Sequence, residues 1–123
     1  LYTLVELDDR PDTEVRVMGS IRDMLLVSQD GSEAVVSRLA DPAIRIVSLT
    51  ITEGGYCMDD STGEFNAKLP HIQHDVENPR TPISVFGLLC AALAKRRGQG
   101  LPAFTVMSCD NLPHNGDVTR KAT

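Results

Sequence analysis

A group of small polar side chains follows an apolar run near the end of the sequence. Ser108, Cys109, Asp110 and Asn111 come directly after the run 103–107, which is short and partly β-branched. Flanked by glycine and proline breaks, such a run is typical of a central parallel strand. Ligands of open α/β sheets bind outside the carboxyl ends of the strands, so we expect these four residues at a ligand crevice. A plain polar loop between a strand and a helix is an equally good interpretation.

Asn111 has the side chain in this group that is best suited to catalysis. Its amide donates hydrogen bonds without titrating, which suits the polarising of a carbonyl oxygen at any pH. The structural alternative is that Asn111 only caps the turn before Pro113. Cys109 with His114 could form a nucleophile and its base, but a cysteine at the end of a core strand is more often simply buried.

A second polar strand end, at 50–55, should lie beside the first if both strands belong to one sheet. Gly54 begins a glycine pair that permits close backbone approach or a positive φ, useful where a flat cofactor ring lies against the main chain; a tight turn is the commoner use. Glu53 could orient water or a ribose hydroxyl, whereas a carboxylate at a strand end is more often solvated.

The elements that must position these residues alternate along the chain. Strand, helix, strand and helix in succession imply right-handed crossovers, so we expect an α/β fold with a mostly parallel sheet, flanking helices and an N-terminal β-hairpin. The expected elements are hairpin strands over 1–7 and 14–18, a helix over 31–40 capped by Ser32, a buried strand over 44–51, a loop with short helical turns over 56–82, a helix from Pro82 to Gly98, a buried strand from 103 and a helix over 116–123.

Composition excludes several classes of function. The 123 residues suffice for one domain or part of one, and the formal charge of −5 argues against binding to nucleic acid or to an anionic membrane surface. The only basic cluster, 95–97, reads as the cationic last turn of a helix. No apolar run approaches the roughly 20 residues that span a bilayer. Three widely spaced cysteines indicate reduced thiols and a cytoplasmic location.

A metal site is a minor possibility. His71 and His74, followed by Asp75, have a spacing that could place two imidazoles on one face of a helix. No cysteine or third histidine stands near them, so we predict no metal.

The two ends of the sequence indicate an excerpt of a longer protein. Leu1 stands where the chain is already in an apolar alternation, and Thr123 falls in the first turns of an expected helix. We therefore expect 1–123 to be the central and C-terminal part of an incomplete domain.

Several stretches carry a resemblance to a known family. Residues 46–56 (IVSLTITEGGY), 63–65, 73–75 and 104–111 (FTVMSCDN) resemble the mannitol dehydrogenase family of long-chain polyol dehydrogenases. The likeness covers essentially the whole chain. It implies a Rossmann-type NAD-binding domain, followed in the full protein by a mostly helical substrate domain. The two-domain enzyme would interconvert a sugar alcohol and a ketose, and we expect mannitol and fructose as its substrates.

The resemblance also implies roles for individual residues. The family's oxyanion-site asparagine falls on Asn111, which we assign to catalysis, and Thr52 and Glu53 fall beside the nicotinamide half of NAD. Cofactor binding is accordingly assigned to Thr52, Glu53, Gly54, Ser108 and Asn111. The glycine-rich pyrophosphate turn should precede the chain and the catalytic lysine should follow it, so we expect the isolated segment to be inactive and to need the missing remainder of its own chain.

Two alternatives stay open. Within the family, the substrate could be a sugar acid, as in fructuronate or tagaturonate reductases. Outside it, an α/β module of this kind could bind a nucleotide or a protein without catalysis, because a fold does not fix a function.

Overall fold

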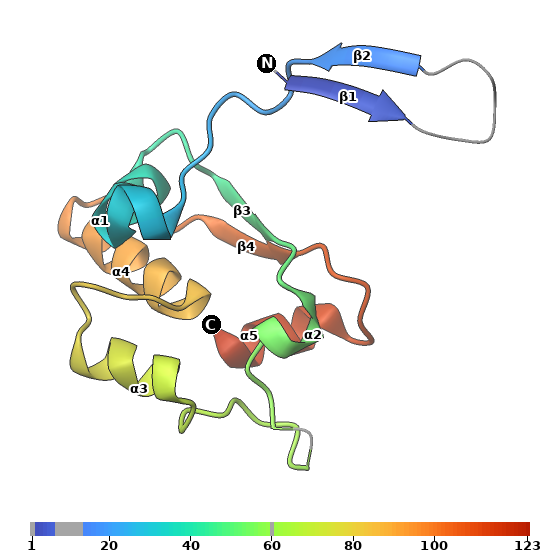
Figure 1. The fold of residues 1–123 in the computed structure, drawn as a ribbon. Helices are drawn as coiled ribbons and strands as arrows, with labels where there is room; N and C mark the ends of the chain where they lie inside the picture. Colours follow the sequence, from blue (N-terminus) through green and yellow to red (C-terminus); the bar gives the residue numbers. More distant parts are fainter. Residues whose placement is uncertain (1, 7–13, 60) are drawn as a thin grey trace.

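The computed structural model describes residues 2–6, 14–59 and 61–123, which form an α/β fold with an attached hairpin (Figure 1). It confirms the predicted fold class. Along the chain the elements are β1 (Tyr2–Glu6), β2 (Glu14–Met18), α1 (Val27–Ala40), β3 (Ile46–Leu49), α2 (Thr52–Gly55), α3 (Pro70–Glu77), α4 (Val85–Gly98), β4 (Thr105–Ser108) and α5 (Asn115–Ala122).

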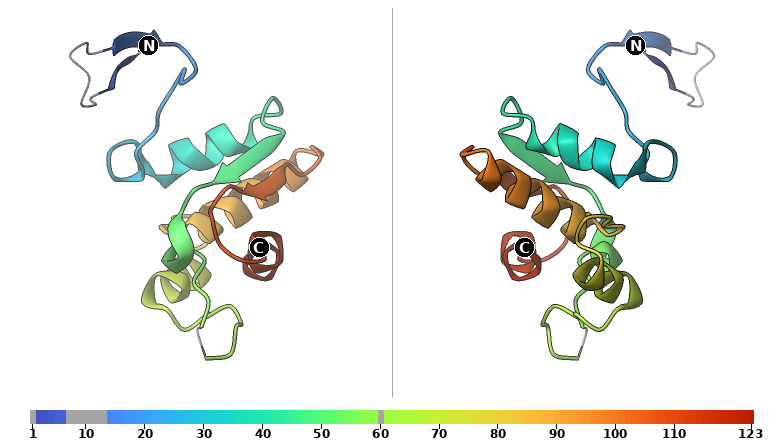
Figure 2. Two further views of the ribbon diagram at one scale, coloured as in Figure 1. Left: turned by 90° about the vertical axis from the view of Figure 1, so that its right-hand side faces the viewer. Right: turned by 90° about the vertical axis from the view of Figure 1, so that its left-hand side faces the viewer.

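Strands β1 and β2 form the predicted antiparallel hairpin. Tyr2 lies opposite Met18, and Val5 lies opposite Val15. The polar connection expected at 8–12 lies outside the described residues. In two directions of view the hairpin stands away from the rest of the molecule, and Val5, Val15 and Val17 are exposed on it (Figure 2). Among the described residues, none of the core cluster around the parallel strands comes from the hairpin.

Strands β3 and β4 pair in parallel, as predicted for the runs beginning at 44 and 103. Ile46 lies opposite Thr105, and Leu49 lies opposite Ser108. The prediction that both strands are buried is wrong. Leu49 is buried, but Ile46 is 59% exposed and Met107 45% exposed. Side chains alternate between the faces of a strand, and within the described residues the helices cover only part of this two-stranded sheet.

Helix α1 begins four residues earlier than the predicted range of 31–40. Gly31, with φ 81° and ψ 159°, interrupts it at the predicted start, and the helix ends at Ala40 as expected before the Asp-Pro pair. At its N-terminus the Asp30 carboxylate accepts a hydrogen bond from the backbone N–H of Leu26 at 2.7 Å. The prediction of a cap at Ser32 is therefore wrong, since the chain enters the helix at Leu26.

Helix α4 begins at Val85 and not at Pro82. The Ser84 hydroxyl accepts a hydrogen bond from the N–H of Gly87 at 3.0 Å, which is the usual way to satisfy a free donor in a first turn. Pro82 lies buried just before this cap. The helix ends at Gly98 as predicted, and α3 is the helical segment expected inside the long loop.

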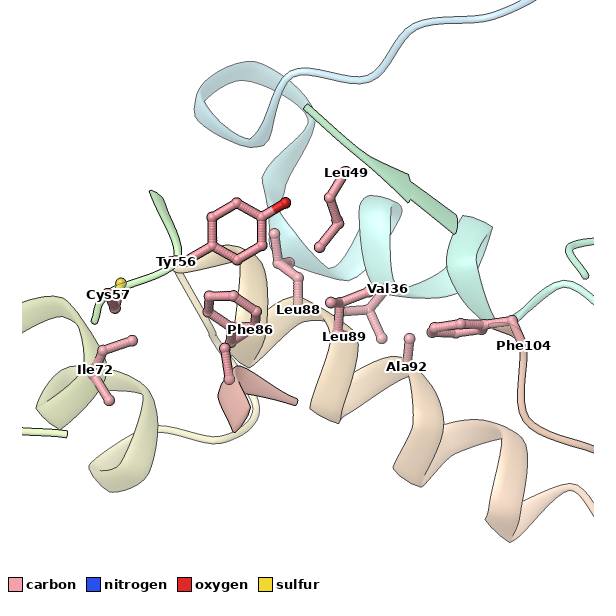
Figure 3. Close-up of a cluster of buried hydrophobic side chains, with 11 residues drawn as sticks. Val36, Leu49, Tyr56, Cys57, Ile72, Phe86, Leu88, Leu89, Ala92 and Phe104 are labelled. Atoms are coloured by element: carbon pink, nitrogen blue, oxygen red, sulfur yellow. The ribbon is translucent and has the colours of Figure 1, made fainter. Parts of the chain in front are cut away.

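The hydrophobic core lies between α1, α4 and the parallel strands. Helices α1 and α4 pack against each other, and α5 contacts β4. No helix among the described residues is long and apolar enough to cross a membrane. The core cluster, most of which is labelled in Figure 3, consists of Val36, Leu49, Tyr56, Cys57, Ile72, Phe86, Leu88, Leu89, Ala92, Phe104 and Ala122.

One charged side chain is part of this interior. Arg96 is 2% exposed; its Nε donates to the carbonyl oxygen of Pro102 and its Nη1 to that of Asp41, both at 2.7 Å. Its guanidinium also lies 5.6 Å from the centroid of the Phe104 ring, a cation–π distance. Arg96 thus joins the end of α1 to the segment before β4, beyond the helix-end role predicted for the basic cluster.

Candidate functional site at the ends of the parallel strands

The two polar strand ends predicted to be neighbours lie side by side. Beyond the last paired residues, the N–H of Cys109 donates to the carbonyl oxygen of Leu49 at 2.8 Å, so the parallel pairing continues past β4. Helix α2 follows β3 after two residues and starts at Thr52. The segment 52–54 and the segment 108–111 therefore leave the same edge of the sheet.

The carboxylate of Asp110 connects these two strand ends. Its Oδ2 accepts a hydrogen bond from the N–H of Ile51 at 2.9 Å, and its Oδ1 accepts one from the N–H of Thr52 at 3.0 Å. The Tyr56 hydroxyl donates to Oδ2 at 2.8 Å and lies 2.6 Å from the hydroxyl of Ser108. From the sequence we expected Asp110 at the ligand crevice but assigned it no role. The hydrogen-bond partners of its carboxylate lie more than 50 positions earlier in the chain.

These contacts set the charge states of the two acidic groups. The N–H of Ile51 is the main cause that holds the pKa of the Asp110 carboxyl below its usual range, so this group is a carboxylate at neutral pH. Burial raises the pKa of Tyr56, and the neighbouring carboxylate of Asp110 acts in the same direction. The phenol therefore stays protonated and remains a hydrogen-bond donor to Asp110.

Just after β3, the residues with a positive φ are not the paired glycines, where the sequence led us to expect it. Gly54 and Gly55 lie in α2 without a positive φ, so that expectation is wrong, whereas Thr52 has φ 61° and Cys57 has φ 56°. Close approach does apply to Gly55, where an added Cβ would lie 2.9 Å from the Cβ of Ile51. A left-handed threonine is strained by roughly 1–3 kcal/mol and persists only where surrounding contacts fix it.

A cavity of about 680 Å³ opens at this edge of the sheet. An added Cβ on Gly54 would meet nothing within 4 Å, so the main chain there is open to a flat group. The Glu53 carboxylate supplies a hydrogen-bond acceptor, and the remaining wall is apolar. Such a wall fits a flat amphipathic ring with hydroxyl or amide donors. The lining residues are Glu53, Gly54, Met58, Leu112, Pro113 and Val118.

The predicted site residues do not all face this cavity. Glu53 and Gly54 line it, and Asn111 is exposed immediately before the lining residue Leu112. Thr52 is exposed at the start of α2. The Ser108 hydroxyl is hydrogen-bonded to that of Tyr56, and Ser108 lines a separate cavity of about 530 Å³ between β4 and α5. The assignments of Asn111 to catalysis and of all five residues to cofactor binding stay predictions.

The minor candidates have other partners. Nε2 of His71 lies 3.3 Å from Sγ of Cys57, and Nδ1 of His74 lies 3.1 Å from Oδ1 of Asp75, so the two imidazoles serve different contacts. No group of three possible metal ligands occurs in the part of the chain that the structure describes. Cys109 is exposed, which corrects the prediction of a buried thiol, because the strand end it follows is open to solvent.

Asp75 is the second carboxylate that organises a loop. It is 8% exposed and accepts hydrogen bonds from the N–H of Ile83 at 2.8 Å and from the N–H and hydroxyl of Ser84 at 2.9 and 2.5 Å. Burial pushes its pKa upward, but these donors, the Ser84 hydroxyl foremost, outweigh burial and leave the pKa below its usual range. Asp75 therefore fixes the start of α4, which packs under the parallel strands.

The whole chain is similar to known proteins in sequence and in structure. Residues 1–123 match the family model described as the mannitol dehydrogenase Rossmann domain. A solved structure, the Pseudomonas fluorescens mannitol 2-dehydrogenase ternary complex with NAD and D-mannitol, is 68% identical with a TM-score of 0.88, covering 98% of this chain and 24% of that one.

Curated relatives point to the same group of enzymes. The polyol:NADP oxidoreductase of Gluconobacter oxydans is 53% identical, and the D-mannonate oxidoreductase of Escherichia coli is 45% identical. Each alignment covers 99% of this chain and 25% of the relative. The chain thus spans about a quarter of the length of the relatives it matches.

Proposed function

Because the chain belongs to the mannitol dehydrogenase family, we propose that it forms the central and C-terminal part of the Rossmann domain of a longer, cytoplasmic, NAD-dependent polyol dehydrogenase. The proposed reaction interconverts mannitol and fructose. The observation that carries this proposal is the 68% identity, over 98% of the chain, to an enzyme solved with NAD and D-mannitol. The relatives named for NADP and for D-mannonate are less similar, at 53% and 45% identity, which favours NAD and a polyol.

The cavity at the strand ends supports NAD as the cofactor. When bound, nicotinamide supplies or accepts the hydride, so the protein has to position it and keep its reactive face against the substrate. Gly54 offers an open stretch of main chain for a flat ring, and Glu53 offers an acceptor for a hydroxyl or carboxamide donor. Leu112 and Val118 add apolar surface for that ring to the lining of the cavity.

Asn111 has the role of stabilising charge on the substrate oxygen. As the substrate passes between alcohol and ketone, its oxygen acquires alkoxide character in the transition state. A neutral amide donor that is fixed in place stabilises this charge more than it stabilises the ground state. Asn111 is exposed and directly precedes Leu112, which lines the cavity, and this supports the assignment.

Variants of Asn111 in the full-length enzyme test this role. Loss of one such donor typically lowers kcat by about 10²–10³-fold, and Asn111→Ala should do so while the affinity for NAD changes little. Asn111→Asp replaces a donor by an anion and should be at least as damaging at neutral pH. Gln99→Ala removes an exposed amide at the C-terminal end of α4, away from the cavity-lining residues, and serves as the matched control. Near-parental kcat in folded Asn111→Ala would refute the role.

Substrate and cofactor choice are tested on the parent enzyme. Initial rates with mannitol, sorbitol and mannonate, each with NAD and with NADP, should give the highest kcat/KM for mannitol with NAD. The 123-residue chain alone should show no turnover and no micromolar binding of NAD in calorimetry, because pyrophosphate recognition normally needs a glycine turn at a helix N-terminus. A full-length protein inactive on all three substrates would favour the non-catalytic alternative.

A further inference from the structure

We propose that Asp110 is a positioning residue, which holds the cofactor-binding segment 52–54 at a fixed distance from Asn111 beside the cavity. The inference rests on the function proposed above. It goes beyond it by assigning a role to a side chain that touches neither the substrate nor the cofactor.

Asp110 contacts the segment after β3 through both oxygens of its carboxylate. Its two carboxylate oxygens accept the N–H groups of two successive residues, Ile51 and Thr52, at 2.9 and 3.0 Å. Thr52 has φ 61°, a conformation that β-branched residues rarely adopt. Two hydrogen bonds at this point hold the backbone in the left-handed turn, and the turn sets the direction in which Glu53 and Gly54 leave the strand.

Asp110 is itself held in place by a buried side chain of the core. The Tyr56 side chain is fully buried, and its hydroxyl donates to Oδ2 of Asp110 at 2.8 Å. The ring of Tyr56 packs near Phe86, with centroids 6.4 Å apart. On the other side, the side-chain amide of Asn115, at the start of α5, donates to the carbonyl oxygen of Asp110 at 3.2 Å. The carboxylate is therefore held to the core by Tyr56, and the backbone of Asp110 is held to α5 by Asn115.

Asp110 also connects two chain segments that contribute to the cavity. Glu53 and Gly54 line the cavity, and so do Leu112 and Pro113, which follow Asn111 in the chain. Asp110 is hydrogen-bonded to the backbone directly before Glu53 and is itself the residue before Asn111. Loss of its bonds would leave the lining residues chemically intact but would alter the separation between the two segments. Because hydride transfer depends on sub-ångström placement of the reacting groups, turnover is more sensitive to this change than binding.

The test compares two carboxylates in the full-length enzyme. Asp110→Asn keeps the shape of the side chain but turns an NH₂ group toward one of the two backbone donors, so one hydrogen bond is lost and replaced by a repulsion. Asp59→Asn is the matched control, because Asp59 also accepts two successive backbone N–H groups, those of Ser61 at 2.9 Å and Thr62 at 3.1 Å, in another turn.

We expect Asp110→Asn to lower kcat by about 10–100-fold, with KM for mannitol and the dissociation constant of NAD changed far less. The deuterium isotope effect on kcat, measured with mannitol labelled at the reacting carbon, should be larger than in the parent because hydride transfer limits the rate. A purely structural role would reduce only the folded fraction and leave the isotope effect unchanged. Asp59→Asn should leave all of these quantities unchanged.

Tyr56→Phe keeps the inference testable if Asp110→Asn does not fold. It removes a single hydroxyl from the same network while the ring continues to fill the core, and it should lower kcat in the same direction by a smaller factor. Parental kcat and isotope effect in either folded variant would overturn the positioning role. A parent enzyme without NAD-linked polyol activity would instead overturn the proposed function, so the two failures are distinguishable.

Discussion

Replacing Gly87 by alanine should destabilise the protein, although alanine is the better helix former. Gly87 lies in the first turn of α4, where an exposed Gly→Ala change ordinarily stabilises a helix by up to about 1 kcal/mol. Here an added Cβ would fall directly on Oδ2 of Asp75, 2.7 Å from its Cγ and 2.9 Å from the Cβ of Pro82. Either the buried carboxylate or the helix start has to move.

The cost follows from what the carboxylate holds. If Asp75 moves, the N–H groups of Ile83 and Ser84 lose their acceptor. A buried donor left without a partner costs about 1–3 kcal/mol, so two of them cost roughly 2–6 kcal/mol, and the gain in helix propensity offsets about 1 kcal/mol of this. We expect a net loss of about 1–5 kcal/mol in the free energy of unfolding. For a chain of 123 residues this corresponds to a fall in Tm of roughly 3–5 °C per kcal/mol.

The assay is thermal unfolding followed by circular dichroism, with Gly116→Ala as the matched control. Gly116 lies in α5 with nothing within 4 Å of an added Cβ, so its replacement should leave Tm unchanged or raise it. In an Asp75→Ala background the Gly87→Ala change should cost much less, because the obstructing carboxylate is gone. A Gly87→Ala protein as stable as the parent, or an equal cost in both backgrounds, would show that the steric reasoning is wrong.

Two further predictions concern stability. Arg96→Ala should lower the free energy of unfolding by about 2–4 kcal/mol, because it leaves the carbonyl groups of Asp41 and Pro102 without their buried donor, whereas exposed Arg97→Ala should change it by about 0.5 kcal/mol or less in urea denaturation. Asp75 and Asp110 have lowered pKa values when folded, so their stabilisation is complete above the ordinary Asp pKa of about 3.9 and is lost as the pH falls through the lower folded pKa values. Tm measured from pH 7 down to pH 3 should therefore drop steeply below about pH 4, and less steeply in Asp75→Asn.

Local patterns were sufficient to predict most of the fold. The apolar runs, the glycine and proline breaks and the alternation of strand and helix predicted the hairpin, the parallel pairing and the end of α4. The errors lie where a nearby contact decides between similar alternatives. Ser84 rather than Pro82 marks the start of α4, because its hydroxyl satisfies the N–H of Gly87. The apolar run of β3 also does not show which face of the strand is covered by helices, so the prediction that the whole strand is buried was wrong.

The candidate site was harder to predict than the fold. The residue types at 108–111 indicated a polar strand end, and the structure places it beside 52–54. The role of Asp110 was not predictable, because its partner Ile51 is 59 positions away and nothing in the local sequence marks the pair. The left-handed backbone fell on Thr52 and not on the glycines beside it, since long-range hydrogen bonds override the local preference of each residue.

The parallel pairing of β3 with β4 also determines when the cavity can exist during synthesis. Its contacts join residues 59 positions apart, so the first strand end leaves the ribosome long before its partner is made. Closing a loop of this length costs entropy, and non-local contacts of this kind slow folding. Until Asp110 has emerged, the N–H groups of Ile51 and Thr52 lack the acceptor that they have in the finished fold. The edge that faces the cavity is therefore completed only after α3 and α4 have been made.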